Sequence, residues 1–164
     1  MSDLEVRIIT LNPMRVASAR GFGENPEPIA WNKLLTWAES KGLLENLDRV
    51  RFFGFNNPDP SPESPAYGYE QWITVTPDVT AEVGVEIKAF PGGLYGVSRC
   101  KGLENIGSTW KQLSAWLENS PYTLGHHQWL EECLTKPRSV RSFEKMPPED
   151  YLMELYCPIS EARS

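Results

Sequence analysis

The sequence repeats itself at a constant offset of 79 positions, and this repeat limits the folds open to the chain. The motif W-x2-L-x2-W begins at Trp31 and again at Trp110. Further identical pairs are Val6 with Val85, Ile8 with Ile87, Arg20 with Arg99, Gly23 with Gly102, and Glu39 with Glu118. Ordinary composition does not produce so many identities in one register. We therefore predict a single domain over residues 1–164, built from two copies of one unit at about 4–78 and about 82–160.

Each copy is predicted to have the element order ββαββ. Alternating apolar and polar residues indicate half-buried strands, and Asn25-Pro26 indicates the start of a helix. Gly42 ends this helix, and Ser120-Pro121 stops its counterpart in the second copy. The expected strands are at about 4–11, 15–20, 49–55 and 67–75 in the first copy and about 83–89, 94–100, 127–134 and 151–157 in the second, whose helix spans about 105–119.

Short turns between neighbouring strands favour hairpins and an antiparallel sheet. Asn12-Pro13 and Pro91-Gly92-Gly93 are such turns. The first helix has an apolar stripe that must cover one sheet face, formed by Trp31, Leu34, Leu35 and Ala38. We predict an α+β fold with helices on one face and a ligand cleft between halves related by a pseudo-two-fold axis. The polar, proline-rich segments 56–62 and 136–148 should be surface loops and are candidate lids.

Composition and charge narrow the setting in which the chain works. Cys100, Cys133 and Cys157 form no C-x-x-C pair, which argues against a disulfide framework and favours a reducing, cytoplasmic location. The formal charge is -6 and no Lys/Arg cluster could hold a phosphate backbone, so we expect no direct nucleic-acid partner. No apolar run approaches the roughly 20 residues of a membrane span, and the N-terminus lacks a basic signal-peptide start.

The sequence predicts neither a metal nor a cofactor. His126-His127 could form a metal or Cys-His site with Cys133, but adjacent histidines point apart and no third ligand has suitable spacing. Pro91-Gly92-Gly93 joins two strands and lacks the lysine of a phosphate loop. We keep His127 as a candidate ligand contact.

Aromatic side chains are the first candidates for contacts to a small molecule. Tyr67, Tyr69 and Trp72 lie in or beside a predicted strand next to Glu70, where alternation divides them between the two sheet faces. Structural burial is the alternative for this group. Trp110 has the spacing of a helix face packed on a sheet, and a place in a ligand cage is its alternative role.

Two adjacent glutamates, Glu131 and Glu132, lie within a predicted strand. Their side chains must point to opposite faces, so one carboxylate should project toward the cleft. A carboxylate in apolar surroundings is costly unless it pairs with a cation or acts as a general base on water. An exposed edge strand that carries both glutamates is the structural alternative.

Several segments of the second copy resemble the GyrI-like effector-binding family. Val85-Glu86-Ile87-Lys88 leads to Phe90-Pro91-Gly92-Gly93-Leu94-Tyr95-Gly96-Val97, and Gly102 and the second tryptophan motif follow. Leu130-Glu131-Glu132-Cys133-Leu134 resembles the glutamate-bearing strand of that family, and Tyr156-Cys157-Pro158-Ile159 resembles its closing strand. The resemblance implies an aromatic cleft with a buried glutamate that meets cationic or polar aromatic ligands. Glu131 is the best match to this glutamate, Glu132 is the one-residue alternative, and Tyr95 matches the aromatic residue after the Gly-Gly turn.

The resemblance leaves three functions open. Many relatives carry a DNA-binding region of AraC or MerR type, which we do not expect here because the sequence begins at the first predicted strand. Phe55-Asn56-Asn57-Pro58 and Tyr67-Gly68-Tyr69-Glu70-Gln71-Trp72 resemble stand-alone members, some of which hydrolyse the cyclopropane of yatakemycin-type antibiotics. The chain is therefore expected to bind or sequester small aromatic or cationic molecules, or to hydrolyse cyclopropanoids with Glu131 or Glu132 as base and a tyrosine such as Tyr69 polarising the electrophile. Regulation by contact with another protein, as in gyrase-inhibitory relatives, is the third alternative, and no pattern marks an oligomer interface.

Overall fold

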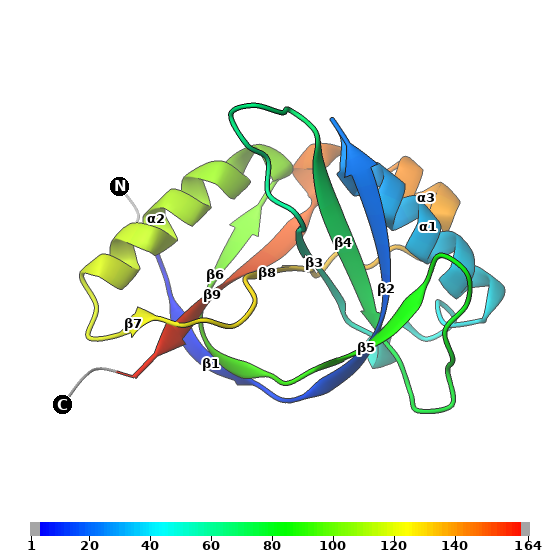
Figure 1. The fold of residues 1–164 in the computed structure, drawn as a ribbon, viewed down its shortest axis with the longest axis horizontal. Coiled ribbons are helices and arrows are strands. Elements are labelled where there is room, and N and C mark those ends of the chain that lie inside the picture. The colour runs from blue at the N-terminus through cyan, green and yellow to red at the C-terminus, as the bar shows by residue number, and fades with distance from the viewer. Residues whose placement is uncertain (1–3, 162–164) are drawn as a thin grey trace. The chain divides into compact units, whose positions relative to one another are not determined.

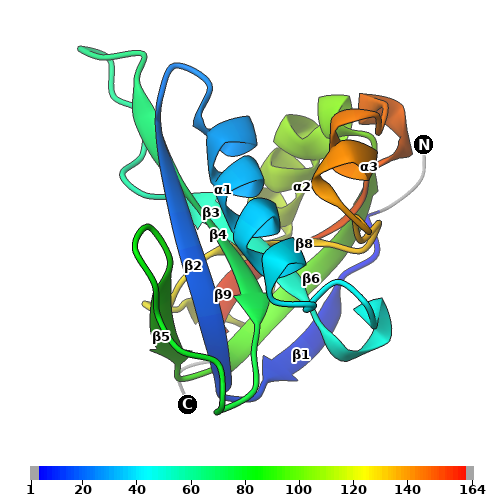
Figure 2. The same cartoon turned by 90° about the vertical axis from the view of Figure 1, so that its right-hand side faces the viewer.

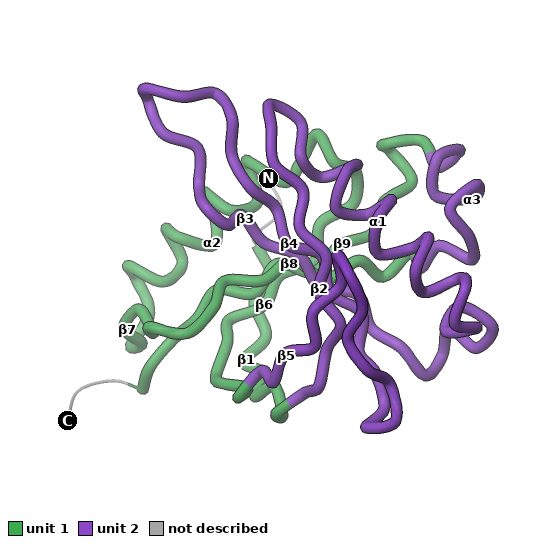
Figure 3. The backbone as a smooth tube through the Cα atoms, turned by 45° about the vertical axis from the view of Figure 1, so that its right-hand side comes forward, with its two compact units in different colours: residues 1–13, 91–135, 147–164 green, residues 14–90, 136–146 purple. Residues whose placement is uncertain are grey.

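The structure, a computed structural model, describes residues 4–161. The chain forms two compact units (Figure 3). Unit 1 contains the chain up to residue 13, residues 91–135 and the chain from residue 147 onward, and unit 2 contains residues 14–90 and 136–146. Each unit has an antiparallel sheet with a long helix on one face, so the predicted α+β class is confirmed.

Unit 1 has the strand order β1-β6-β9-β8, with all neighbouring strands antiparallel, and β7 pairs with the far end of β9. The strands are β1 Arg7–Leu11, β6 Gly93–Lys101, β7 Thr123–Leu124, β8 Leu130–Cys133 and β9 Leu152–Ser160. Helix α2 (Ile106–Glu118) packs on β6 and β9 (Figure 1). The approach is close at Gly96, where an added Cβ would lie 2.7 Å from the Trp116 ring.

Unit 2 has the strand order β3-β4-β2-β5, again antiparallel throughout. The strands are β2 Met14–Gly23, β3 Phe52–Asn56, β4 Tyr67–Thr74 and β5 Glu86–Phe90. Helix α1 (Pro26–Ser40) packs on β2 and β4 (Figure 2). Its predicted apolar stripe is confirmed, because Trp31, Leu34, Leu35 and Ala38 are all buried.

The hairpins expected at Asn12-Pro13 and Pro91-Gly92-Gly93 do not form, whereas the last two strands of each copy, β3 with β4 and β8 with β9, do pair. β5 pairs with β2 and β6 pairs with β1, so the strands on either side of Pro91-Gly92 do not pair with each other. The first strand of each predicted copy therefore pairs with the second strand of the other copy. Gly92 has a φ of 84° and its α-carbon faces the Leu11 carbonyl so closely that a Cβ would collide with it. The glycine lets two connecting segments pass where a side chain would block them.

Two shorter elements also depart from the expected pattern. The predicted loop 136–148 contains helix α3 (Val140–Glu144), which begins with a capping box between Ser139 and Ser142. Phe143 of this helix stacks on Trp31 with ring centroids 5.0 Å apart. β8 begins three residues later than expected, which leaves His127 outside the strand. No helix within residues 4–161 is long and apolar enough to cross a membrane.

Candidate functional site

In each unit the long helix covers one face of the sheet, α1 in unit 2 and α2 in unit 1, and the opposite face of each sheet is called its helix-free face. Tyr67 and Tyr69 point toward α1, as shown by the hydrogen bond from the Tyr67 hydroxyl to Glu27 of that helix. Gly21, opposite Tyr69 in the ladder, lies against Ala30 of α1. Glu70 and Trp72 alternate with these tyrosines and lie on the helix-free face. The predicted set is therefore divided between faces, and the two tyrosines are not beside Glu70.

Glu70 is the centre of a buried hydrogen-bond network on the helix-free face. The residue is 2% exposed. Its Oε1 accepts hydrogen bonds from Ser18 Oγ at 2.8 Å, Trp72 Nε1 at 3.1 Å and Lys88 Nζ at 2.7 Å. Its Oε2 accepts a hydrogen bond from Asn57 Nδ2. Four donors from three strands and one loop therefore converge on one carboxylate.

These contacts determine the charge of Glu70. Burial alone would raise its pKa, but the hydrogen bonds from Lys88, Asn57, Ser18 and Trp72 together lower the pKa below its usual value of 4.5. The carboxylate is therefore ionised at neutral pH. An ionised carboxylate with a depressed pKa is a good counter-ion and a weak general base.

Trp72, which hydrogen-bonds to the Glu70 carboxylate, belongs to a cluster of aromatic rings. Trp72 packs edge-on against Phe55 with centroids 5.0 Å apart and against Phe90 at 5.6 Å. All three rings are less than a tenth exposed. The sequence singled out Trp72 and Glu70 but missed the two phenylalanines and the donors Ser18, Asn57 and Lys88. Their register with β4 comes from strand pairing and has no local sequence signal.

In unit 1, the two adjacent glutamates of β8 point to opposite faces as expected. Glu131 Oε2 accepts a hydrogen bond of 3.2 Å from Trp110 Nε1 of α2, so this carboxylate is on the helix side. Glu132 is 3% exposed and its Oε1 accepts a hydrogen bond of 2.6 Å from the Tyr156 hydroxyl on the helix-free face. The structure therefore favours Glu132 over Glu131 as the carboxylate on that face, because the β8–β9 register places Glu132 and Tyr156 together.

Trp110 lies where α2 meets β8, in keeping with the helix-face packing predicted from its spacing. It is half-buried, its ring packs edge-on against Trp129 at 5.4 Å, and it holds Glu131. The buried residues of α2 are Thr109 and Leu113. Trp110 therefore joins the helix to β8 at the sheet surface.

Tyr95 and His127 meet beside Tyr156. The Tyr95 ring packs edge-on against His127 at 4.8 Å and against Tyr156 at 5.4 Å. The Tyr95 hydroxyl donates to the Gln128 carbonyl, and His127 Nε2 lies 2.7 Å from the Leu94 carbonyl. Burial raises the pKa of Tyr95 well above its usual value, so its hydroxyl stays protonated. Two predicted contact residues are thus brought together with Glu132 through Tyr156.

The two sheets carry a carboxylate at equivalent positions. Glu70 lies opposite Arg20 in unit 2, and Glu154 lies opposite Arg99 in unit 1. Arg20 and Arg99 are one of the repeat pairs, so Glu154 is the counterpart of Glu70. Glu154 was not among the predicted site residues.

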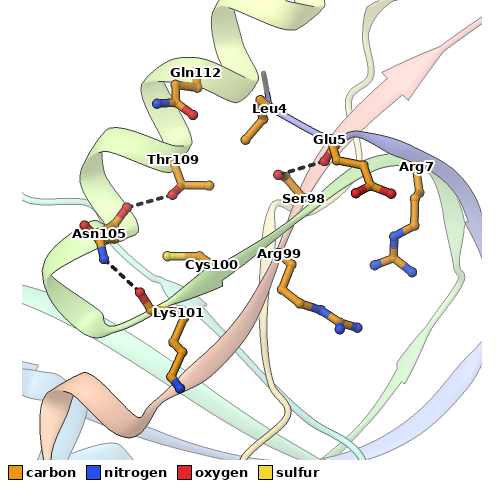
Figure 4. A pocket seen from close by; sticks show the side chains of 10 residues that line it. All are labelled: Leu4, Glu5, Arg7, Ser98, Arg99, Cys100, Lys101, Asn105, Thr109 and Gln112. Carbon is orange, nitrogen blue, oxygen red and sulfur yellow. Dashed lines mark hydrogen bonds between the residues drawn. The ribbon is translucent and has the colours of Figure 1, made fainter. Parts of the chain in front are cut away.

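Glu154 is held by two arginines that line a separate cavity. Arg7 forms an ion pair with Glu154, and Arg99 lies 3.5 Å from the same oxygen. Both arginines line a cavity of about 500 Å³ next to α2, together with Lys101 (Figure 4). None of the residues described as lining this cavity is aromatic. It therefore differs in chemistry from the Glu70 site, where Trp72 and its aromatic neighbours lie beside the carboxylate.

A possible metal site can be sought among the His, Cys, Asp and Glu side chains. Among residues 4–161, no three His, Cys, Asp or Glu side chains are grouped so that they could hold a metal ion. His126, His127 and Cys133 do not form such a group.

Comparison with known proteins gives one family and several similar folds. The family model described as GyrI-like small molecule binding domain matches residues 4–160. No curated protein matches the sequence.

Three solved structures illustrate the likeness. EcmrR in a complex with DNA has a TM-score of 0.70 and 15% identity; the match covers 96% of this chain but 58% of that one. A hydrolase from Listeria innocua has a TM-score of 0.68 and 16% identity, with 98% and 94% covered. SAV2435 bound to tetraphenylphosphonium has a TM-score of 0.53 and 14% identity, with 96% and 94% covered. At these identities the likeness shows a shared fold. Because the family model spans nearly all of the chain, the protein belongs to the GyrI-like small molecule binding domain family.

Proposed function

We propose that this chain binds small organic cations with aromatic groups, and that Glu70 on the helix-free face of unit 2 supplies the counter-charge. The observation that carries this proposal is the contact between Lys88 and Glu70. The site already holds an alkylammonium group 2.7 Å from a buried carboxylate, beside the aromatic rings around Trp72.

The physical chemistry of the Glu70 site suits a lipophilic cation. An ionised carboxylate in apolar surroundings is costly without a positive partner. Aromatic faces attract cations and bury apolar surface at the same time. The binding of tetraphenylphosphonium by the structural relative SAV2435 supports this ligand class.

Calorimetric titration with tetraphenylphosphonium tests the proposal. We expect the wild-type protein to bind this cation and Glu70→Gln to raise the Kd by about 10- to 100-fold, because the amide removes a charged partner. Glu39→Gln, which removes an exposed charge on α1, is the matched control and should bind like wild type. Equal affinity in Glu70→Gln and wild type would contradict the assignment.

A second candidate function, hydrolysis of cyclopropanoid compounds, is favoured by the pairing of Glu132 with the Tyr156 hydroxyl. In this reaction a water oxygen bonds to a cyclopropane carbon, and the ring C–C bond breaks. Its electron pair moves into the conjugated dienone. Glu132 accepts the water proton, and the resulting phenolate takes up a proton, so the product gains one water. Glu70 suits this role poorly because its pKa is lowered.

Mass spectrometry of a yatakemycin-type cyclopropanoid incubated with the protein tests this second function. Water addition should disappear in Glu132→Gln. Glu131→Gln is the matched comparison, since Glu131 is on the helix side and should be dispensable. If only Glu131→Gln loses turnover, the assignment to Glu132 is wrong and Glu131, the residue favoured by the sequence, is the general base.

We also propose that the protein works in the cytoplasm and makes no direct contact with nucleic acid. All three cysteines are free and buried, which supports a reducing, cytoplasmic environment. The charge of -6 supports an absence of direct nucleic-acid contact.

A further inference from the structure

We propose that Lys88 is a tethered cation that occupies the Glu70 site without ligand and moves to Glu86 when a ligand cation binds. This inference rests on the proposed binding function. It assigns to Lys88 the role of a specificity-determining residue that competes with the ligand for one carboxylate.

Lys88 reaches Glu70 from the edge of the sheet. It lies on β5, opposite Val16 of β2, whereas Glu70 lies on β4, opposite Arg20 of β2. The lysine side chain must therefore extend diagonally across β2. Ser18 occupies β2 between these two positions, and its hydroxyl also binds Glu70. A small residue at this position leaves space for the lysine.

The partners of this ion pair differ in exposure and in the number of their contacts. The Glu70 side chain is 3% exposed and is fixed by three other donors. The Lys88 side chain is 37% exposed and extends from an edge strand. Displacement of Lys88 therefore leaves the carboxylate in place and returns a flexible ammonium to water.

Glu86 provides a second partner for the same ammonium. It precedes Lys88 by two residues on β5, so both side chains project from one face of the strand. Glu86 Oε2 lies 3.9 Å from Lys88 Nζ, and its side chain is 77% exposed. A small rotation can transfer the ammonium from the buried carboxylate to the exposed one without loss of a counter-ion.

Unit 1 shows the contrasting arrangement. The strand registers make Arg7 the counterpart of Glu86 and Ile9 the counterpart of Lys88. Glu154 is held there by two guanidinium groups, those of Arg7 and Arg99. Only in unit 2, among the described residues, does the equivalent carboxylate have a single lysine with an alternative carboxylate nearby.

This arrangement selects among cations. A simple alkylammonium gains no more from Glu70 than Lys88 does, and must also displace a tethered competitor. A delocalised cation with aromatic groups gains ring contacts with Trp72 and its neighbours in addition. The exchange therefore favours large lipophilic cations over small amines.

Lysine acetylation measured by mass spectrometry, with and without saturating tetraphenylphosphonium, tests the exchange in the wild-type protein. The probe should increase the acetylation rate of Lys88 by about threefold or more, because the displaced amine is more exposed. Lys111, on the exposed side of α2, is the internal control and should not change. An unchanged or slower rate at Lys88 would overturn the proposal.

Titration of Lys88→Met with the same probe provides an independent measurement. If Lys88 leaves Glu70 about a tenth of the time without ligand, its removal should lower the apparent Kd by about tenfold. Glu86→Gln should weaken binding, since the displaced lysine loses its second partner. Two outcomes overturn the exchange. In the first, wild type binds the probe, but Lys88→Met binds it no more tightly and the acetylation rate of Lys88 does not change. In the second, Lys88→Met binds the probe and wild type does not. Failure of both proteins to bind instead overturns the proposed function.

Discussion

Glu70 stabilises the folded protein when its carboxylate is ionised. Because its pKa in the folded protein is below the usual 4.5, the stabilisation is fully present above pH 4.5 and is lost as the pH falls through the folded-state pKa. Glu70→Gln should therefore lower the free energy of unfolding by about 1–3 kcal/mol near neutral pH, because the hydrogen bonds from Ser18, Asn57 and Trp72 no longer meet a charged acceptor. The difference between mutant and wild type should shrink below pH 4.5.

Urea unfolding of both proteins across this pH range measures the effect. The Glu39→Gln protein controls for the loss of one negative charge. If the free energy of unfolding of Glu70→Gln stays below that of wild type by the same amount down to acidic pH, the charge of Glu70 does not account for its contribution to stability.

At the residue scale, the sequence could identify Glu70, Trp72 and the glutamate pair of β8, but not their partners. Alternation shows that Glu131 and Glu132 must face opposite sides, and this was confirmed. Which of them faces the helix depends on the β8–β9 register, which the local sequence does not contain. Lys88 was missed for the same reason, since its contact with Glu70 spans two strand pairings.

At the element scale, the contact between α1 and β2 depends on Gly21. A Cβ on this residue would lie 2.8 Å from Ile29 Cβ and 2.9 Å from the Ala30 nitrogen. Gly21→Ala should therefore push the helix from the sheet and destabilise the fold by about 1–3 kcal/mol. Denaturant unfolding, with two-state analysis, gives this value.

Gly107 offers a matched control within α2. An added Cβ there has no neighbour within 4 Å, so Gly107→Ala should stabilise the protein by about 0.5–1 kcal/mol through helix propensity. Similar small effects for both alanine variants would contradict the packing described for α1.

The elements themselves were largely predictable, whereas the pairing of the first two strands of each copy was not. Apolar periodicity and the proline and glycine boundaries placed α1, α2 and most strands within a few residues. The same turns suggested hairpins, but β1 pairs with β6 and β5 with β2. Turn residues limit the local path of the chain, and the choice of partner strand is made by contacts far apart in sequence.

At the scale of the whole molecule, the repeat has a chemical as well as a structural meaning. Glu70 and Glu154 occupy equivalent ladder positions, although they are 84 residues apart and the repeat offset is 79. A difference in loop length hides the pair from an alignment without gaps. One copy holds its carboxylate with arginines and the other with a single lysine, so duplication followed by divergence leaves one carboxylate open to exchange.

A crystal structure of the protein with tetraphenylphosphonium tests the central claim most directly. We expect the cation on the helix-free face of unit 2, with a phenyl group or the phosphonium within about 6 Å of the Trp72 ring and Lys88 turned from Glu70 toward Glu86. A cation bound elsewhere, with Lys88 still on Glu70, would contradict the assignment of this carboxylate as the ligand's counter-ion.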